Sequence, residues 1–488
     1  MVFSSAIFLF AFFPVLFAVY HIVPGMKGKN AVLILFSLLF YCFGRLAYLP
    51  LLIVSILVNW AAGRLLGKIE DKPKRKLAVT LTVVFDLGLM GVFKYLDFFI
   101  ENINGVFGTA IPLQNIPLPL GISFFTFTAL SYVIEVYRKP KNMAKSLWKV
   151  ALYIALFPTI LSGPIVGYKT AAPQLDERVC TVEKTAQGLR RFIVGMAKKL
   201  LVADVVGRMV DAIFAGSVLD ARLAWLGAVG YAVQIFFDFA GYSDMAIGIG
   251  QMFGFTFPEN FNRPYIALGL TDFWKRWHIS LTTWFRNYLY MPLVMTKPLQ
   301  KLYKKWAAKY GRPKANKLSI LIPMTVVWLL TGLWHGAAWN YVLWGLWHGL
   351  FCALEGVSII RTKSFEKTFW GRLVLHVYTW LVVLLGTVLF RSGSMAQVGQ
   401  MFAAMFTGWR FTAAGTLMLQ QQLTGLNVFC LVLGIVLSIV VLPKKKALAE
   451  GQAAWVTAVS YVLVMALFVL CVMTMAQSGF QPFIYLQF

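Results

Sequence analysis

The sequence predicts an all-α, polytopic integral membrane protein, and three observations support this fold class. Of the 488 residues, 59% are hydrophobic and 13% are charged, which excludes an ordinary soluble domain. Apolar stretches of about 20 residues, the length that crosses a bilayer as a helix, recur along the whole chain. Lysine and arginine gather in the short segments between these stretches, as the positive-inside rule predicts for cytoplasmic loops.

The formal net charge of +26 would favour nucleic acid as a partner if the protein were soluble. Because the basic residues lie between membrane-length segments, we expect anionic lipid headgroups as partners and no nucleic acid. The 5 cysteines lie far apart and form no C-x-x-C pair, so we interpret them as packing residues.

The apolar stretches predict about 11 transmembrane or re-entrant helices around a central funnel or chamber, with interfacial amphipathic helices, in a single domain of residues 1–488. Residues 31–63 are too long for one crossing and are broken at Gly44-Arg45 and Pro50. Residues 150–168 contain two prolines, which predict a re-entrant or funnel-lining element. The other expected spans are 3–23, 77–100, 120–136, 221–257, 318–357 (which goes out and returns), 373–390, 426–442 and 455–475, and Lys444–Lys446 marks a further cytoplasmic loop.

The functional site is expected within residues 119–348, the part of the chain richest in motifs. His278 and His335 lie there in apolar, aromatic sequence. An ionisable side chain near the bilayer centre costs roughly 2.5 to 3.5 kcal/mol on insertion scales, so a histidine there requires a reason. We interpret that reason as catalysis.

Residues 272–291 are predicted to form one amphipathic helix, capped by Thr271, with Asp272 at the positive end of its dipole. His278 lies at the edge between the two faces, where it is either catalytic or a satisfied structural histidine. Arg276 lies on the polar side, and Asn287 could donate a hydrogen bond to an acyl carbonyl. The residues that share the apolar face are Phe273, Trp277, Leu281, Trp284 and Tyr288.

His335 has both small and large neighbours. Small residues let another helix or a ligand approach closely, and tryptophans supply apolar walls. A neutral imidazole there could take a proton from a hydroxyl nucleophile, with core packing as the alternative. The small neighbours are Gly332, Gly336, Ala337 and Ala338, and the large ones are Trp334 and Trp339.

Two carboxylates, Asp238 and Asp244, flank Ser243 in apolar sequence. They could form a polar site or proton path, but we favour structural ion pairs with one of three arginines. No metal site is expected, because His335 and His348 are too far apart on one helix to share an ion and no H-E-x-x-H or cysteine pair occurs. The candidate arginines are Arg263, Arg276 and Arg286.

Several motifs together resemble the membrane-bound O-acyltransferase (MBOAT) family, in particular its bacterial branch of alginate O-acetylation and teichoic-acid D-alanylation proteins. The likeness extends over nearly the whole chain, including the carboxyl end at 481–488. The motifs are 119–127, Leu-Ser-Gly-Pro-Ile at 161–165, 234–244, Pro-Glu-Asn-Phe-Asn-Arg-Pro-Tyr at 258–265, 272–293 and Leu-Trp-His-Gly at 333–336.

The resemblance implies transfer of an acyl group, with acetyl favoured, from a cytoplasmic thioester to hydroxyls of a surface polysaccharide or peptidoglycan. The family's essential histidine matches His335, and His278 matches its second position. No cofactor is expected to stay bound; the donor is acetyl-coenzyme A or the phosphopantetheine thioester of an acyl-carrier protein. An extracytoplasmic acyltransferase is the implied partner, and a bacterial cytoplasmic (inner) membrane the implied location.

In the expected mechanism, residues 157–167 and the helix carrying His278 line a funnel from the basic cytoplasmic face to a chamber at His335. The candidates for binding the substrate or the acyl group are Asn287, Trp334, Asp238, Ser243 and Arg276. Three alternatives stay open: D-alanyl transfer from a carrier protein to teichoic acid, a transporter or flippase that uses intramembrane carboxylates, and a passive membrane scaffold.

Overall fold

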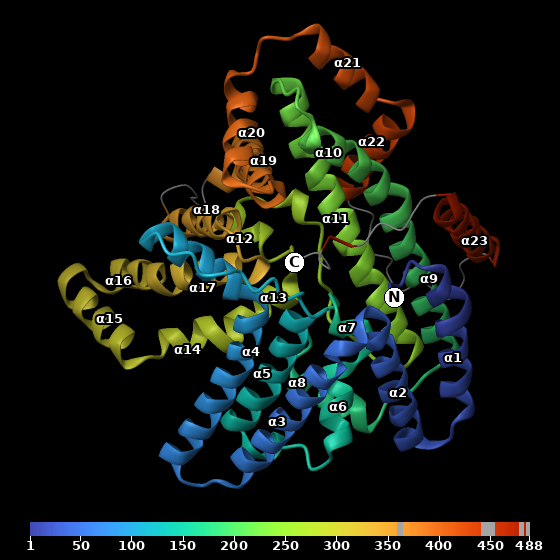
Figure 1. Cartoon of the computed structure of the whole chain (residues 1–488), viewed down its shortest axis with the longest axis vertical. Helices are drawn as coiled ribbons and strands as arrows, with labels where there is room; N and C mark the ends of the chain where they lie inside the picture. The colour runs from blue at the N-terminus through green and yellow to red at the C-terminus, as the bar shows by residue number, and fades with distance from the viewer. Residues whose placement is uncertain (359–364, 441–453, 478–482, 485–488) are drawn as a thin grey trace. The chain divides into compact units, whose positions relative to one another are not determined.

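The computed structural model describes residues 1–358, 365–440, 454–477 and 483–484. Every secondary-structure element within these ranges is helical (Figure 1). The chain divides into two compact units, Met1–Phe192 with Tyr242–Pro258, and Ile193–Gly241 with Glu259–Ile484. The expectation of one domain stays a prediction. The basic loop at 444–446 and all but two residues of the motif at 481–488 lie outside the described residues.

Within the described ranges, six helices are long and apolar enough to cross a membrane, or up to seven if the bent pair of α21 (Ala413–Gln422) and α22 (Gly425–Ile439) is one span. This agrees with a polytopic membrane protein but does not confirm the expected number of about 11. A shorter apolar helix, Phe8–Ile22, replaces the span expected at 3–23. Two of these six candidate spans, Gly25–Lys68 and Arg312–His335, each join two consecutive α-helices of the chain. The other four are Lys72–Phe107, Ala221–Met252, Phe369–Arg391 and Ala458–Gln477.

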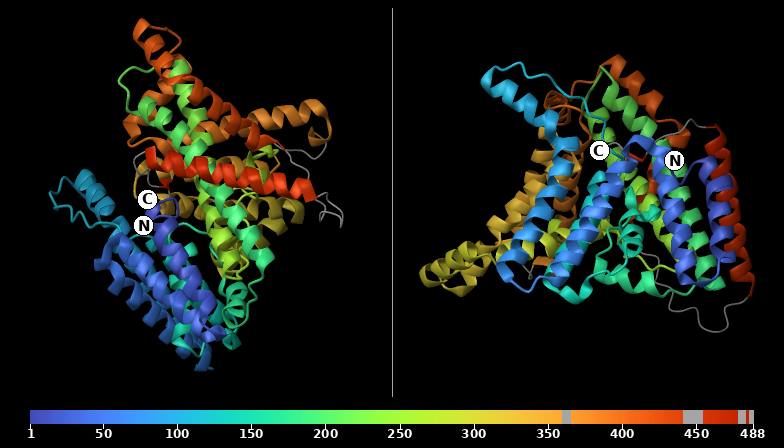
Figure 2. Two further views of the ribbon diagram at one scale, coloured as in Figure 1. Left: turned by 90° about the vertical axis from the view of Figure 1, so that its right-hand side faces the viewer. Right: turned by 60° about the horizontal axis from the view of Figure 1, so that its bottom comes forward.

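In the first unit, α2 (Gly25–Arg45) and α3 (Leu49–Lys68) are separated by the 3-10 turn η2 (Leu46–Tyr48), so the predicted break near Pro50 is confirmed. Helices α3, α4 (Lys72–Phe107) and α5 (Ile122–Arg138) pack side by side (Figures 1 and 2). The Asp71 side chain accepts the Lys74 N–H at 2.9 Å and caps α4.

The proline-containing stretch of the first unit is broken as expected, because proline cannot continue the helical hydrogen-bond pattern. It consists of α6 (Leu147–Ala155), α7 (Phe157–Ile160) and, after an irregular segment, α8 (Tyr168–Asp176). A Cβ added to Gly163 would lie 2.2 Å from the Pro158 carbonyl oxygen, so this turn requires glycine. The Phe157 ring packs against Phe3, Phe8 and Phe40 and anchors the break in the aromatic core of the unit.

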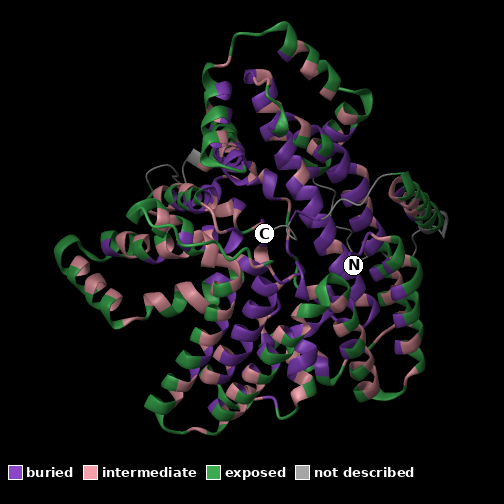
Figure 3. Cartoon of the chain, viewed as in Figure 1, coloured by how far each residue is buried: buried purple, intermediate pink, exposed green. Residues whose placement is uncertain are grey.

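The chain enters the second unit through α9 (Val182–Ala197), the π-helical turn η4 (Lys198–Ala203) and α10 (Asp204–Ala215). Helix α11 (Ala221–Met252) follows and is mainly buried (Figure 3). Helices α10 and α22 pack against each other.

The remaining described elements of the two units are η1 (Phe8–Phe12), α1 (Phe13–Ile22), η3 (Pro140–Asn142), η5 (Pro264–Ile266), η7 (Phe365–Lys367), α19 (Phe369–Arg391), α20 (Met395–Thr407) and α23 (Ala454–Gln477).

Helices α17 (Leu321–His335) and α18 (Trp339–Gly356) form the predicted helical hairpin with His335 at its turn. Glycines make their close contact possible. A Cβ added to Gly345 would lie 2.3 Å from the Trp328 carbonyl oxygen and 3.0 Å from the Gly332 Cα. The interpretation that small residues near His335 admit a neighbouring helix is therefore confirmed.

The prediction of one helix over 272–291 is wrong. The chain instead forms α12 (Leu270–Phe273), a turn ending at His278, α13 (Ile279–Phe285), η6 (Arg286–Tyr290) and α14 (Met291–Val294). Thr271 lies inside α12 and is not its cap; the Glu355 carboxylate of α18 accepts the N–H groups of Leu270 and Thr271 at 2.5 and 2.9 Å. A tertiary contact therefore starts this segment where local capping was expected.

Helices α15 (Lys297–Tyr310) and α16 (Arg312–Ser319) form a second hairpin, which projects from the rest of the second unit in Figure 1 and in the right-hand view of Figure 2. None of the residues of α15, all of which the structure describes, is buried. In Figure 3 helix α15 is accordingly coloured as intermediate and exposed, whereas Ala315 of α16 is buried.

Candidate functional site

His335 is the last residue of α17 and is 4% exposed. Aromatic rings from two other helices meet its imidazole edge to face. The Trp344 ring of α18 lies 4.8 Å away at 83°, and the Phe390 ring of α19 lies 5.1 Å away at 78°. Three helices therefore converge on this side chain, and apolar surface surrounds an imidazole that can exchange a proton.

His348 lies on α18, so the assumption that His335 and His348 share one helix is wrong. The Trp344 ring contacts both, at 4.8 Å from the His335 ring and 5.0 Å from the His348 ring. Across the described residues, no group of three or more histidine, cysteine or acidic side chains is arranged to hold a metal ion.

His278 lies between α12 and α13 with a left-handed backbone, φ 44° and ψ 52°. This conformation is rare for a residue with a Cβ and costs of order 1–3 kcal/mol, so surrounding contacts must hold it. Asn260 provides two of these contacts. Its backbone carbonyl oxygen accepts the Ile279 N–H at 2.9 Å, and its side-chain Oδ1 accepts the Ser280 N–H at 3.2 Å. These bonds break the helix that residues 272–291 would otherwise form.

The imidazole of His278 is 1% exposed. Its Nδ1 lies 3.1 Å from Asn260 Oδ1, and the Phe239 ring of α11 meets it edge to face at 4.6 Å. His278 lies outside the candidate spans, and burial lowers its pKa to about 3. The ring is therefore neutral near pH 7, since desolvation disfavours the charged form.

Trp334 links the two histidines within the second unit. Its ring centroid lies 6.0 Å from that of His278 and 4.8 Å from that of His335. The side chain is 4% exposed, so it forms a buried wall shared by both imidazoles. Of the predicted site residues, these three are brought together by the structure.

A family model described as MBOAT, membrane-bound O-acyltransferase family, matches residues 143–396, a range that includes His278, Trp334 and His335. The chain belongs to the membrane-bound O-acyltransferase family. It is therefore an O-acyltransferase, as the sequence motifs predicted.

Relatives of this O-acyltransferase include proteins with different named acceptors. A probable alginate O-acetylase of Azotobacter vinelandii is 35% identical over 523 residues, covering 100% of both chains. A peptidoglycan O-acetyltransferase of Helicobacter pylori is 31% identical over 438 residues, covering 83% of this chain and 80% of the relative. A teichoic acid D-alanyltransferase of Bacillus subtilis is 32% identical over 281 residues, covering 55% and 64%.

Asp238 is buried in an ion pair of the second unit. Its Oδ1 lies 2.7 Å from the Lys199 ammonium nitrogen, which lies 2.7 Å from Asp204 Oδ1 as well. Asp238 Oδ2 accepts the Ile484 N–H at 2.9 Å, and the Lys199 ammonium lies 4.7 Å from the Phe483 ring centroid. An ion pair of Asp238 was expected. Its partner is Lys199 of the π-helical turn η4, so the expectation of an arginine partner for Asp238 was wrong.

The other predicted binding residues lie in different surroundings. Asp244 pairs with Arg191 at 2.8 Å in the first unit, where Ser243 is 2% exposed. Arg276 pairs with Asp272 at 3.1 Å, four residues away. Asn287 lies on η6 and is exposed. A role for these residues in binding the acyl group stays a prediction.

Sequence reasoning missed Asn260, Lys199 and Glu355. Each makes its contacts to residues distant in the chain: Asn260 to His278, Lys199 to Asp238, and Glu355 to Leu270 and Thr271. The only available indication was that Asn260 lies inside the motif at 258–265. Helical periodicity cannot detect such pairs, because it describes only neighbours within one element.

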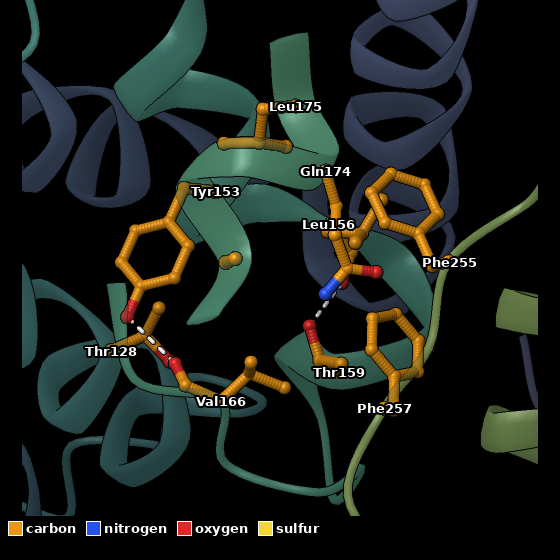
Figure 4. Close-up of a pocket in the computed structure, with 10 residues that line it drawn as sticks. Thr128, Tyr153, Leu156, Thr159, Val166, Gln174, Leu175, Phe255 and Phe257 are labelled. Atoms are coloured by element: carbon orange, nitrogen blue, oxygen red, sulfur yellow. Dashed lines mark hydrogen bonds between the residues drawn. The ribbon is translucent and has the colours of Figure 1, made fainter. Parts of the chain in front are cut away.

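A small pocket in the first unit lies beside the proline break (Figure 4). Phe255 and Phe257 form apolar walls, and Thr159 and Val166 come from the segment that was expected to line a funnel. The Tyr153 hydroxyl donates to the Val166 carbonyl at 2.7 Å and holds that segment in place. The funnel itself stays a prediction.

Proposed function

We propose that this O-acyltransferase moves an acetyl group from a cytoplasmic thioester toward hydroxyls of a cell-surface polysaccharide or peptidoglycan, with His335 as the general base. The observation that carries this proposal is the position of His335, buried at the meeting point of α17, α18 and α19 and sharing Trp334 with His278.

In the proposed reaction, the acceptor hydroxyl oxygen attacks the thioester carbonyl carbon, and the His335 imidazole takes the hydroxyl proton. The carbon–sulfur bond then breaks, and the proton passes to the departing thiolate. General-base assistance of this kind contributes about 10²- to 10⁴-fold in rate. The aromatic walls formed by Trp344 and Phe390 exclude water, which would otherwise compete as the nucleophile.

Acetyl is favoured over D-alanyl because the relatives named as O-acetylases match more of the chain. The alginate-type relative covers 100% of this chain, whereas the D-alanyltransferase covers 55%. The donor would be acetyl-coenzyme A, whose phosphates suit the basic loops. An extracytoplasmic acyltransferase would complete transfer to the polymer, and the protein would lie in the cytoplasmic membrane of a bacterium.

The test compares acetyl content of the cell envelope, by polymer class, in cells carrying the wild-type protein, His335→Ala or His21→Gln at matched membrane abundance. We expect His335→Ala to remove acetyl from one polymer by about 10²-fold or more. His21 lies on α1, and its Nδ1 is hydrogen-bonded to the Phe17 carbonyl of the same helix, so His21→Gln should keep wild-type acetylation.

Two results would count against the proposal. Unchanged acetyl with loss of D-alanine esters in His335→Ala would assign the protein to D-alanylation. Unchanged esters of both kinds in His335→Ala would remove His335 from catalysis. In that case the base would have to be sought elsewhere among the buried polar side chains of the second unit.

A further inference from the structure

We propose that Asn260 is a positioning residue that fixes the tautomer of His278, with the proton on Nδ1 and the lone pair on Nε2. His278 would then present a hydrogen-bond acceptor to the substrate beside Trp334. Only this last assignment, to the substrate, rests on the proposed function; the tautomer follows from the hydrogen bonds around Asn260.

The first step is the orientation of the Asn260 side-chain amide. The Ser280 backbone N–H points at the Asn260 Oδ1 position at 3.2 Å, and the Ser280 hydroxyl donates to the same atom at 2.9 Å. A backbone N–H can only donate, so the atom that it meets must accept. The amide oxygen therefore faces Ser280, because the flipped amide would place its own N–H groups against the Ser280 backbone N–H.

The second step is the proton on His278. Its Nδ1 lies 3.1 Å from the same Asn260 Oδ1. An amide oxygen has no hydrogen to give, so Nδ1 must be the donor. A neutral imidazole carries one N–H, which leaves Nε2 with the lone pair. The low pKa of His278, about 3 and caused by burial, agrees with a neutral ring at physiological pH.

The third step is the rigidity of this arrangement. Asn260 is 1% exposed, and its own carbonyl oxygen accepts the Ile279 N–H at 2.9 Å. The neighbouring Asn262 N–H donates to the Arg276 carbonyl at 2.8 Å. Both ends of the segment that carries His278 are therefore bonded to the segment that carries Asn260. With the backbone held in this way, a rotation of the ring that presents Nδ1 to the substrate would break its hydrogen bond to Asn260 Oδ1.

Two of the described neighbours of His278 are uncharged aromatic rings. The rings of Phe239 on α11 and Trp334 on α17 pack against it, and neither titrates in the physiological range. The charged residues that flank these contacts in sequence are Asp238, paired with Lys199, and Arg276, paired with Asp272. The tautomer is therefore controlled by the amide of Asn260.

The direct test is nitrogen magnetic resonance of the full-length protein in lipid nanodiscs, labelled with ¹⁵N at the histidine rings. The His278 resonances are assigned by their loss in His278→Gln. We expect a protonated Nδ1 and an unprotonated Nε2 in the wild type at pH 7. A protonated Nε2 would overturn the proposal, whatever the enzymatic activity of the sample.

Two substitutions separate positioning from folding. Asn260→Asp keeps an acceptor oxygen, so the Nδ1–H tautomer should persist. Its negative charge favours imidazolium, so the ring should titrate at a higher pH than in the wild type. Asn260→Leu removes the acceptor and should yield a mixture of tautomers. If Asn260→Leu kept the wild-type tautomer, Asn260 would not be the positioning residue.

The functional arm measures envelope acetyl content at matched protein abundance. Mutating a residue that orients a histidine ligand in a metal site commonly lowers metal affinity or activity about 10- to 100-fold. We expect Asn260→Leu to lower acetyl content by a factor of this size, and Asn260→Asp to keep the wild-type acetyl content at neutral pH. The control is Asn262→Leu, two residues away with an exposed side chain, which should match the wild type. Equal acetylation in Asn260→Leu and Asn262→Leu would overturn the positioning role. An absent effect of His335→Ala would instead reject the proposed function and leave the tautomer result intact.

Discussion

The ammonium nitrogen of Lys199 lies 2.7 Å from Oδ1 of Asp238, and both side chains are buried. Asp238 is followed by Phe239, whose ring meets His278 edge to face at 4.6 Å. The ion pair thus fixes α11 directly behind one of the two site histidines. Lys199 also pairs with Asp204 at 2.7 Å, so removing Lys199 would leave two buried carboxylates without their cation, which is more costly than losing an exposed pair.

We predict that Lys199→Ala lowers the free energy of unfolding by about 3–5 kcal/mol, the usual cost of leaving buried charge uncompensated, because Asp204 and Asp238 both lose their cation. The measurement is the thermal unfolding midpoint of the purified protein in detergent. The matched control is Asp211→Ala, which removes a pair with Arg391 at 2.6 Å whose side chains are 54% and 30% exposed. Its effect should stay below about 1 kcal/mol. Equal destabilisation by the two changes would contradict this account of the Lys199 cluster.

The contact between α17 and α18 predicts a second effect. Gly345→Ala would place a methyl group 2.3 Å from the Trp328 carbonyl oxygen. We expect destabilisation of about 1–3 kcal/mol and reduced acetylation, because the helix that ends at His335 must move. The control is Gly399→Ala on α20, where an added Cβ would have no described atom within 4 Å. This change should leave the stability unchanged or raise it by up to about 1 kcal/mol. If the Gly345→Ala protein were as stable as the wild type, α17 and α18 could move apart without loss of stability, which would contradict this prediction.

Helix α15 predicts a dependence on anionic lipid. Its basic residues cluster on one side of the helix, and its partly exposed apolar and aromatic residues, among them Tyr303 and Trp306, lie on the other, as in helices that bind membrane surfaces. Each lysine near an anionic surface contributes about 1 kcal/mol. We expect anionic lipid in nanodiscs to stabilise the wild type more than a variant with glutamine at four positions. These positions are Lys301, Lys304, Lys305 and Lys309.

The control for α15 replaces the same four lysines with arginine, which keeps the charge and should keep the stabilisation. Added salt should weaken the lipid effect in the wild type, because exposed charges are screened beyond about 10 Å at 0.1 M. If the glutamine variant responded to anionic lipid as strongly as the wild type, the hairpin would not contact the membrane surface. Stabilisation by an acidic carrier protein in neutral lipid would assign the surface to a protein partner instead.

The sequence alone determined the all-α membrane class, the break near Pro50, the proline-interrupted stretch and the place of His335 at the turn of a helical hairpin. These features follow from apolar length and from the missing N–H of proline, both of which are local properties. The motifs also identified the family, and they predict His278 and His335 as site residues. They could not establish the number of spans, because several helices are shorter than the roughly 20 residues needed to cross a bilayer, or are bent.

Only the tertiary structure decided how the site is held. The pattern of residues 272–291 suits one amphipathic helix, yet hydrogen bonds from Asn260 break it at His278. Lys199 pairs with Asp238 across 39 residues of sequence, and Trp334 brings His278 and His335 to one wall. In each case a residue satisfies a buried polar group, or fills an apolar space, on another element. Such choices depend on which surfaces meet in the folded chain, and helical periodicity describes only the surface of one element at a time.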